Sequence, residues 1–275
     1  MRRWQVAAAA LVGTVAILAS SGVAMADGHD HGGDHALVCK GGDISPGSYD
    51  GLVVTGPCSI SSGPVTVDGN LVIQPGALLD ATTLAGPLIV TGNVFVRREG
   101  VLYYGCGPSA PCSGSTPGTT VEIDRVGGSI IAVGAFAVVI HSVTVKGDVS
   151  MVHGGAGLSE CGEGLFFDSE GAVIGGDLRI IGIRTCWMGA LRNMVGGNLI
   201  DVRNQMGDPD GNEVMANSVG GNLVCFDNSP AVHPNDLSTG SAVGVPNTVH
   251  GRALGECSPS DISTVVPRST DRDSD

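Results

Sequence analysis

The residues Val195-Gly196-Gly197-Asn198-Leu199 recur unchanged at positions 219–223, and six further copies of the same phrase are degenerate. The consensus is an aliphatic residue, any residue, Gly, Asn or Asp, and a second aliphatic residue. In chain order the copies are VDGNL 67–71, VTGNV 90–94, VGGSI 126–130, VKGDV 145–149, IGGDL 174–178, VGGNL 195–199, VGGNL 219–223 and VHGRA 249–253. Their key glycines are 19 to 36 residues apart. A minimum spacing near 20 with variable insertions is typical of a solenoid, in which extra residues form loops between coils.

The alternation of residues around the phrase indicates strands. Val67, Gly69, Leu71 and Ile73 share one side of an extended chain, and the same parity holds in other copies. We expect the glycine to lie on the inward side at a bend, where a side chain would collide with the interior and positive φ is accessible. The next residue is Asn, Asp or Ser in seven copies. These residue types suit a left-handed turn or a hydrogen-bonded ladder between coils.

An antiparallel array of hairpins, giving an antiparallel β-sandwich, is the alternative. Residues 65–73 alone would form a hairpin at Asp68-Gly69. Other copies place Gly-Gly, Thr-Gly, Lys-Gly or His-Gly there, and few of these suit a type I′ turn equally well. We therefore expect an all-β protein, a single-stranded parallel β-helix (β-solenoid) of about eight irregular coils with loop insertions.

The V-x-G-[N/D]-L phrases resemble the repeats of parallel β-helix proteins, including the bactofilin-like polymer-forming solenoids and the pectate-lyase-like superfold. They also resemble exported, Gly-rich repeat proteins of bacteria. The resemblance covers roughly residues 50–257 at the level of the five-residue motif. It implies a solenoid architecture. The pectate-lyase-like branch would imply a polysaccharide lyase with clustered acidic residues for Ca²⁺ and a basic residue, or a hydrolase with grouped aspartates near a His.

Composition excludes several other classes of protein. The chain has 275 residues, of which 44 are Gly, 42% are hydrophobic and 15% are charged. This mixture is too apolar for a disordered protein and too poor in Leu, Glu and Lys for a helix bundle. Collagen would need a G-X-Y period, which is absent from the sequence. The formal net charge of −13 repels phosphate backbones, so we expect no nucleic-acid partner.

The N-terminal residues have the pattern of an export signal. Arg2 and Arg3 precede an uncharged run over 6–19, and Ala24-Met25-Ala26 supplies a small-x-small cleavage site. The run is shorter than the ~20 residues that cross a bilayer. We therefore expect a signal peptide over 1–26, no membrane span after its cleavage, and a secreted, extracellular protein.

The rest of the chain divides by composition. Residues 27–36 form a leader rich in His, Gly and Asp, residues 37–257 the solenoid domain, and residues 258–275 a tail rich in Ser, Thr and Asp that we expect to be disordered. Three leader histidines, His29, His31 and His35, lie among carboxylates. Neutral imidazole binds Zn²⁺ and related ions, so weak divalent-metal binding by this leader is one candidate function.

Eight cysteines lie after residue 26, and an even number in an exported chain indicates four disulfides. Eight cysteines allow 105 connectivities. Pairing of sequence neighbours predicts Cys39–Cys58, Cys106–Cys112, Cys161–Cys186 and Cys225–Cys257. The absence of a C-x-x-C sequence argues against a redox motif or a zinc ribbon.

The best catalytic or calcium-binding candidates are Asp148, Asp177 and Arg179. The two aspartates occupy the same repeat position in consecutive copies, so stacking would place their carboxylates about 4.8 Å apart beside Arg179. The same position carries Asn in neighbouring copies, so membership in a polar ladder is the alternative interpretation. The histidines at 141, 153, 233 and 250 stand apart in the sequence without an evident triad-like partner.

One outward position carries an unusual row of apolar residues. The residues that follow the inward aliphatic are Val72, Phe95, Ile131, Ser150, Arg179, Ile200, Val224 and Leu254. Six of these eight are apolar, and an exposed stripe of that length is unusual for a monomer. Cover by the chain's own loops, self-association through a sheet face, or contact with a cell-surface polymer would each account for it. The burial of Phe95 and Ile200 would reveal a cover.

The sequence favours a structural or surface-interaction role for an exported, disulfide-stabilised solenoid, without an identifiable catalytic site. A polysaccharide-active lyase or hydrolase is the alternative from another class. Ca²⁺ or Zn²⁺ are the only cofactors that the residues suggest.

Overall fold

The computed structural model describes residues 36–82, 86–105, 124–159, 161, 167–233 and 246–258. All of these residues belong to one compact unit. Among the described residues all regular elements are β-strands. None of these residues forms a helix long and apolar enough to cross a membrane. The leader histidines His29, His31 and His35, and the cysteines Cys106 and Cys112, lie outside the described residues.

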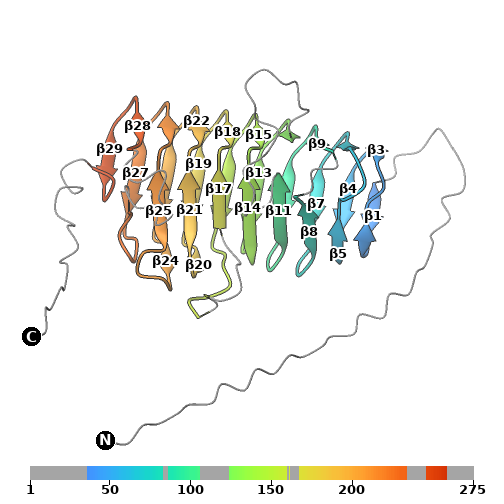
Figure 1. Ribbon diagram of the computed structural model, residues 1–275, viewed down its shortest axis with the longest axis horizontal. Coiled ribbons are helices and arrows are strands. Elements are labelled where there is room, and N and C mark those ends of the chain that lie inside the picture. Colours follow the sequence, from blue (N-terminus) through green and yellow to red (C-terminus); the bar gives the residue numbers. More distant parts are fainter. Residues whose placement is uncertain are drawn as a thin grey trace, which may run out of the picture. The chain divides into compact units, whose positions relative to one another are not determined.

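Three long sheets, here called A, B and C, contain almost all the strands, and every strand pair is parallel (Figure 1). Sheet A consists of β1 (Leu37–Cys39), β4 (Leu52–Val54), β7 (Leu71–Ile73), β10 (Val94–Val96), β13 (Ile130–Val133), β16 (Val149–Val152), β19 (Leu178–Ile181), β23 (Leu199–Val202), β27 (Leu223–Phe226) and β29 (Ala253–Gly255). Sheet B consists of β2 (Gly42–Asp43), β5 (Pro57–Ser59), β8 (Leu78–Ala81), β11 (Val101–Gly105), β14 (Ala137–His141), β17 (Phe167–Glu170), β21 (Met188–Leu191) and β25 (Asn212–Met215). Sheet C consists of β3 (Gly47–Tyr49), β6 (Val65–Val67), β9 (Leu88–Val90), β12 (Arg125–Val126), β15 (Thr144–Val145), β18 (Val173–Ile174), β22 (Met194–Val195), β26 (Ser218–Val219) and β28 (Thr248–Val249). A two-stranded sheet pairs β20 (Arg184–Thr185) with β24 (Gln205–Met206).

The chain visits the three sheets in turn, so most strands pair with the third strand before and after them. This is the parallel β-helix predicted from the repeats, and the antiparallel sandwich is excluded. Each copy of the repeat phrase is the corner between sheets C and A: Val67 ends β6 and Leu71 begins β7. Sheet A has ten strands because β1 and β4 precede the first of the eight copies.

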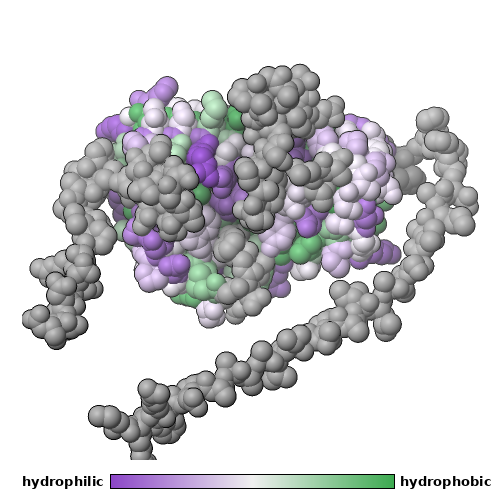
Figure 2. All heavy atoms as spheres, in the orientation of Figure 1, coloured by the Kyte–Doolittle hydropathy of each residue, from purple (hydrophilic) through white to green (hydrophobic). Residues whose placement is uncertain are grey.

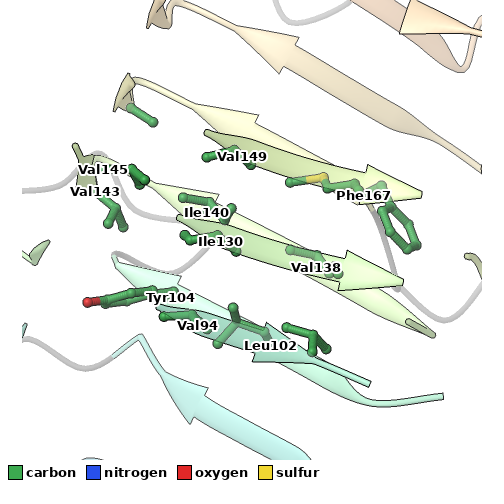
Figure 3. Close-up of a cluster of buried hydrophobic side chains, with 14 of the residues drawn as sticks. Val94, Leu102, Tyr104, Ile130, Val138, Ile140, Val143, Val145, Val149 and Phe167 are labelled. Atoms are coloured by element: carbon green, nitrogen blue, oxygen red, sulfur yellow. The ribbon is translucent and has the colours of Figure 1, made fainter. Parts of the chain in front are cut away.

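The interior is a stack of aliphatic side chains. The first residues of the sheet A strands pair in register from rung to rung and are almost fully buried; they include Leu52, Leu71, Val94, Ile130, Val149, Leu178, Leu199 and Leu223. Figure 3 shows Val94, Ile130 and Val149 at successive levels, beside Tyr104, Ile140 and Phe167. Burial of each such side chain contributes about 1.5–3 kcal/mol, so the stack is the main source of stability.

The motif glycines are required for a different reason from the one expected. None of them has a positive φ. Instead, a Cβ atom on any of the eight would lie 2.0–2.6 Å from an atom of the preceding rung. At Gly197 that atom is Oδ1 of Asp177, at 2.1 Å. Glycine is therefore required because the neighbouring rung, and not the interior, occupies the space that a side chain would need. The expectation of a left-handed conformation at these glycines was wrong.

The residues after these glycines form the hydrogen-bonded ladder that was one of the two expectations. Each backbone N–H donates to the side-chain oxygen of the equivalent residue one rung earlier, at 2.7–3.0 Å. The ladder runs through Asn70, Asn93, Ser129, Asp148, Asp177, Asn198, Asn222 and Arg252. Each such bond contributes about 1 kcal/mol net. This series of bonds fixes the register of the C–A corner along the solenoid.

The left-handed residues lie at the other two corners. Non-glycine residues with φ of 53–60° are Glu99, Ser142, His153, Arg192, Arg203, Ala216 and Asp227. Several are followed by a buried or half-buried asparagine, and these asparagines form two shorter ladders, Asn193–Asn217–Asn247 and Asn204–Asn228–Glu256. The amide groups also donate to backbone carbonyls of neighbouring rungs, for example Asn217 Nδ2 to Ala190 O at 2.7 Å. All three corners therefore carry polar ladders.

Disulfides join Cys39 to Cys58, Cys161 to Cys186 and Cys225 to Cys257. These match three of the pairs predicted from sequence neighbours. Disulfides persist in oxidising compartments and are rare in the reducing cytosol. The three bonds therefore indicate an extracytoplasmic location.

Candidate functional site

The structure brings Asp148, Asp177 and Arg179 together at the C–A corner. Arg179 Nη1 donates to Asp148 Oδ2 at 2.9 Å, and Nη2 donates to Asp177 Oδ2. The other oxygen of Asp148 accepts from the backbone N–H of Asp177, and that of Asp177 accepts from Asn198. Hydrogen bonds from the Asp177 N–H and from Arg179 lower the pKa of Asp148, and the bond to Asp148 raises the pKa of Arg179.

Every carboxylate oxygen in this cluster already accepts a hydrogen bond, and the guanidinium is shared between both acids. This geometry continues the ladder and adds an ion pair across two rungs. A catalytic or calcium-binding role for these three residues stays a prediction.

Arg179→Met is expected to lower the free energy of unfolding by less than about 1 kcal/mol, because partly exposed ion pairs contribute little. The difference should shrink in about 1 M salt, which screens charges beyond ~3 Å. Urea unfolding at low and high salt measures both effects, with Arg98→Met at an exposed pair as the control. A larger loss that does not respond to salt would contradict the assignment as a surface ion pair.

The outer face of sheet A carries two apolar rows, which we name the outer A face. The first row is the predicted stripe, extended by β1 and β4: Val38, Val53, Val72, Phe95, Ile131, Ser150, Arg179, Ile200, Val224 and Leu254 pair in register. The second row is Val133, Val152, Ile181, Val202 and Phe226. Phe95 and Ile200 are half-buried rather than buried, and Val133 and Phe226 are 54% and 44% exposed. These side chains are not fully covered.

The opposite pattern holds on the outer face of sheet B, where polar side chains are buried. His141 ends β14 and pairs in register with Glu170 of β17, and Asp168 projects from the same face of β17 two residues earlier. His141 Nε2 and Asp168 Oδ2 are 2.6 Å apart, and both residues are only 5% exposed. Glu170 accepts a hydrogen bond from Arg192. We name His141, Asp168 and Glu170 the sheet B cluster.

Burial dominates the electrostatics of the sheet B cluster. Desolvation raises the pKa of Asp168, and the hydrogen bond from His141 opposes that shift. Within the described residues, Asp168 Oδ1 is buried and has no hydrogen-bond partner. An ionised oxygen held this way is costly unless a positive group compensates it.

Sequence reasoning missed this cluster, since His141 was given no triad-like partner. The Asp168-Ser169-Glu170 alternation was the available signal, because residues i and i+2 of a strand share a face. The register partner of His141 is Glu170, and Asp168 lies two residues before that partner, so His141 and Asp168 are diagonal neighbours. Only the coordinates show which residues of the two strands are paired.

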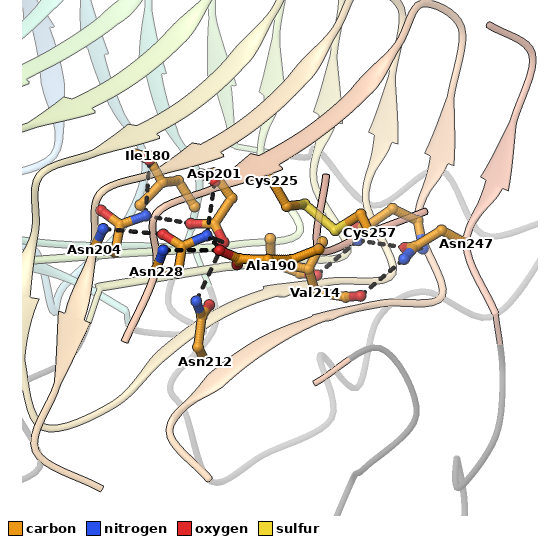
Figure 4. The surroundings of a disulfide bond; sticks show 12 residues. Ile180, Ala190, Asp201, Asn204, Asn212, Val214, Cys225, Asn228, Asn247 and Cys257 are labelled. Carbon is orange, nitrogen blue, oxygen red and sulfur yellow. Dashed lines mark hydrogen bonds between the residues drawn. A yellow bond between two sulfur atoms is a disulfide. The ribbon is translucent and has the colours of Figure 1, made fainter. Parts of the chain in front are cut away.

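A second buried acid lies at the C-terminal end of the solenoid, near the Cys225–Cys257 bond (Figure 4). Asp201 occupies the inward position that Ile180 holds one rung earlier. Side-chain amides of Asn204, Asn212 and Asn228 donate to its carboxylate. Desolvation nevertheless raises its pKa to about 7.

The surface differs between faces. In the view of Figure 2, hydrophilic and intermediate residues make up most of the described surface, and the hydrophobic patches are small and separate. The face of the described residues seen in this view therefore shows no continuous apolar row.

Comparison of this chain with protein-family models, with curated proteins and with solved structures finds no match. The class of protein is accordingly defined by the fold alone: a disulfide-bonded parallel β-solenoid.

Proposed function

We propose that this protein is a secreted structural solenoid whose outer A face binds the same face of a second copy. The observation that carries the proposal is the pair of rows on the outer A face, whose apolar members are half-buried or exposed; the first row extends along all ten strands of sheet A and the second along the five from β13 to β27. Parallel sheets are normally covered on both faces. The outer A face lacks such a complete cover, and a partner would supply it.

A second copy fits this face because the two surfaces have the same period. Side chains repeat along each row at the strand spacing of about 4.8 Å, and two sheets pack face to face about 10 Å apart. Rows with equal spacing can interdigitate along their whole length, as paired sheets do in steric zippers. A cell-surface polymer could interdigitate with these rows along their length only if its own repeat had the same spacing.

Charge does not prevent this contact. The chain as a whole carries −13, but Arg179 is the single charged member of the two rows and is paired with Asp148 and Asp177. The excess negative charges therefore lie outside the two rows, where solvent and salt screen them, and the guanidinium of Arg97 lies over the ring of Phe95, 5.4 Å from its centroid.

The test replaces Ile131 and Ile200 together by Lys in the full chain. We expect the wild type to sediment as a concentration-dependent dimer, and the double variant to dissociate at least tenfold more readily, because lysines would be buried opposite each other. The matched control is Thr66→Lys with Thr144→Lys, at half-buried outward positions of sheet C, and it should leave the dimer intact.

Sedimentation velocity over a wide concentration range measures the association, and circular dichroism checks the fold of each variant. A wild type that stays monomeric throughout would reject the second copy. Retention of that monomer on insoluble cell-wall polymer, lost in the Ile131/Ile200 variant, would instead assign the face to a polymer.

A further inference from the structure

We propose that the sheet B cluster, His141, Asp168 and Glu170, binds a divalent first-row transition metal ion. This site is separate from the outer A face and does not depend on the proposed self-association. It is also distinct from the His-rich leader and from the Asp148–Asp177 corner.

The ligand atoms are already gathered. One atom from each of the three residues lies within 4.8 Å of the other two. One imidazole nitrogen with two carboxylates is a donor set that Zn²⁺ and its neighbours accept in proteins. All three residues lie on paired strands, so the backbone ladder holds their Cα atoms in place without any loop ordering.

An independent observation points to a cation. Asp168 is 5% exposed, and within the described residues its Oδ1 has no hydrogen-bond partner. Buried polar oxygens in native structures are almost always satisfied. His141 pairs with the other oxygen, Oδ2, and a metal ion beside Oδ1 would supply the partner that this oxygen lacks.

The neighbouring rung approaches Asp168 closely through a glycine. Gly189 pairs with Asp168 in register, and a Cβ atom there would lie 2.8 Å from Asp168 Oδ1. The same Cβ would lie 2.4 Å from the ring of Trp187. The glycine therefore keeps a side chain away from the free oxygen, and the indole ring lies at the edge of the site.

Charge at the cluster also fits a cation. Asp168 and Glu170 are both acids. Arg192, which directly follows the neighbouring strand β21, forms an ion pair with Glu170. Glu170 is half-buried, with 32% of its side chain exposed, so it can turn toward an ion without opening the core. Ion binding would then exchange part of the Arg192 contact for a metal–carboxylate bond.

The experiment uses the full chain with His29, His31 and His35 replaced by Ala, which removes the leader as a competing ligand. Trp4 is replaced by Phe, which leaves Trp187 as the one fluorescent indole. Zn²⁺ is titrated by calorimetry, and Co²⁺ is titrated with Trp187 fluorescence as the readout. We expect one ion per chain and quenching by Co²⁺.

Glu170→Gln and Asp168→Asn should each weaken Zn²⁺ binding at least tenfold and abolish the quenching. Glu99→Gln, at an exposed acid, is the matched control and should change neither. Because Glu170 is half-buried, its variant should fold even where the Asp168 variant does not, and thermal unfolding verifies this. Absence of binding to the starting chain, or unchanged affinity in folded Glu170→Gln, would overturn the proposal.

Discussion

Asp201→Asn is expected to flatten the pH dependence of stability, removing about 4 kcal/mol of the loss that the wild type shows between pH 4 and pH 8. Burial raises the pKa of Asp201 from the ordinary 3.8 to about 7. Between these values the folded protein holds a proton that the unfolded chain releases. The stabilisation is therefore complete below about pH 4 and is lost as pH rises through 7.

The substitution preserves the shape of the side chain. Asn212 donates to Asp201 and has a buried Oδ1 without a hydrogen-bond partner among the described residues. Rotation of that amide would let it accept from the new amide at 201. The polar cluster can thus adapt without leaving a cavity.

Urea unfolding at intervals from pH 4.5 to 8 measures the effect, with the exposed Asp68→Asn as control. Asp124 also has a raised pKa, about 6, again through burial. Asp124 therefore also makes the free energy of unfolding fall as pH rises, and this contribution should persist in the Asp201→Asn variant. If Asp201→Asn and the wild type show parallel pH profiles, the assignment to Asp201 is wrong.

Gly197→Ala is expected to cost about 4 kcal/mol. Its Cβ would lie 2.1 Å from Asp177 Oδ1 and 2.9 Å from the backbone carbonyl of Gly176. Overpacking of this kind costs about 1–3 kcal/mol. Displacing Asp177 Oδ1 also breaks its bond with the Asn198 N–H, and an unsatisfied buried donor costs about 1–3 kcal/mol more.

Gly76→Ala separates this effect from backbone conformation. Gly76 has a φ of +72°, and a Cβ there meets nothing within 4 Å. We expect about 1 kcal/mol for the left-handed conformation alone. Denaturant unfolding of both variants gives the comparison, and equal losses would refute the close-approach explanation of the motif glycine.

The parallel order of the strands was predictable because each repeat phrase marks the same corner. The aliphatic residues on both sides of the glycine also predicted correctly which face of each strand points into the interior. The first two rungs lie within the predicted domain 37–257 but outside the eight repeat copies; at the second of them, Asp50-Gly51-Leu52 lacks the polar residue between glycine and aliphatic. The second row of the outer A face was missed because several strands extend to four residues, as in Ile130–Val133.

The sites were harder to predict for a physical reason. Asp148, Asp177 and Arg179 lie within the regular repeat, so equal repeat positions placed them together. His141 and Asp168 lie in sheet B, where the spacing between rungs is changed by insertions and no phrase marks the corner. Asp201 occupies a position that parity assigns to an aliphatic, and parity alone gives no sign that amides of other rungs surround it.

The chemistry of Arg252 ends the C–A ladder within the described residues. From Asn70 onward each rung offers a side-chain oxygen to the next backbone N–H, and the N–H of Arg252 takes the last one, from Asn222. Arginine has only donors, so it offers no acceptor to a further rung. Within the described residues the ladder therefore ends at this position: the backbone N–H of Arg252 is its last donor, and its side chain provides no acceptor that could continue the series.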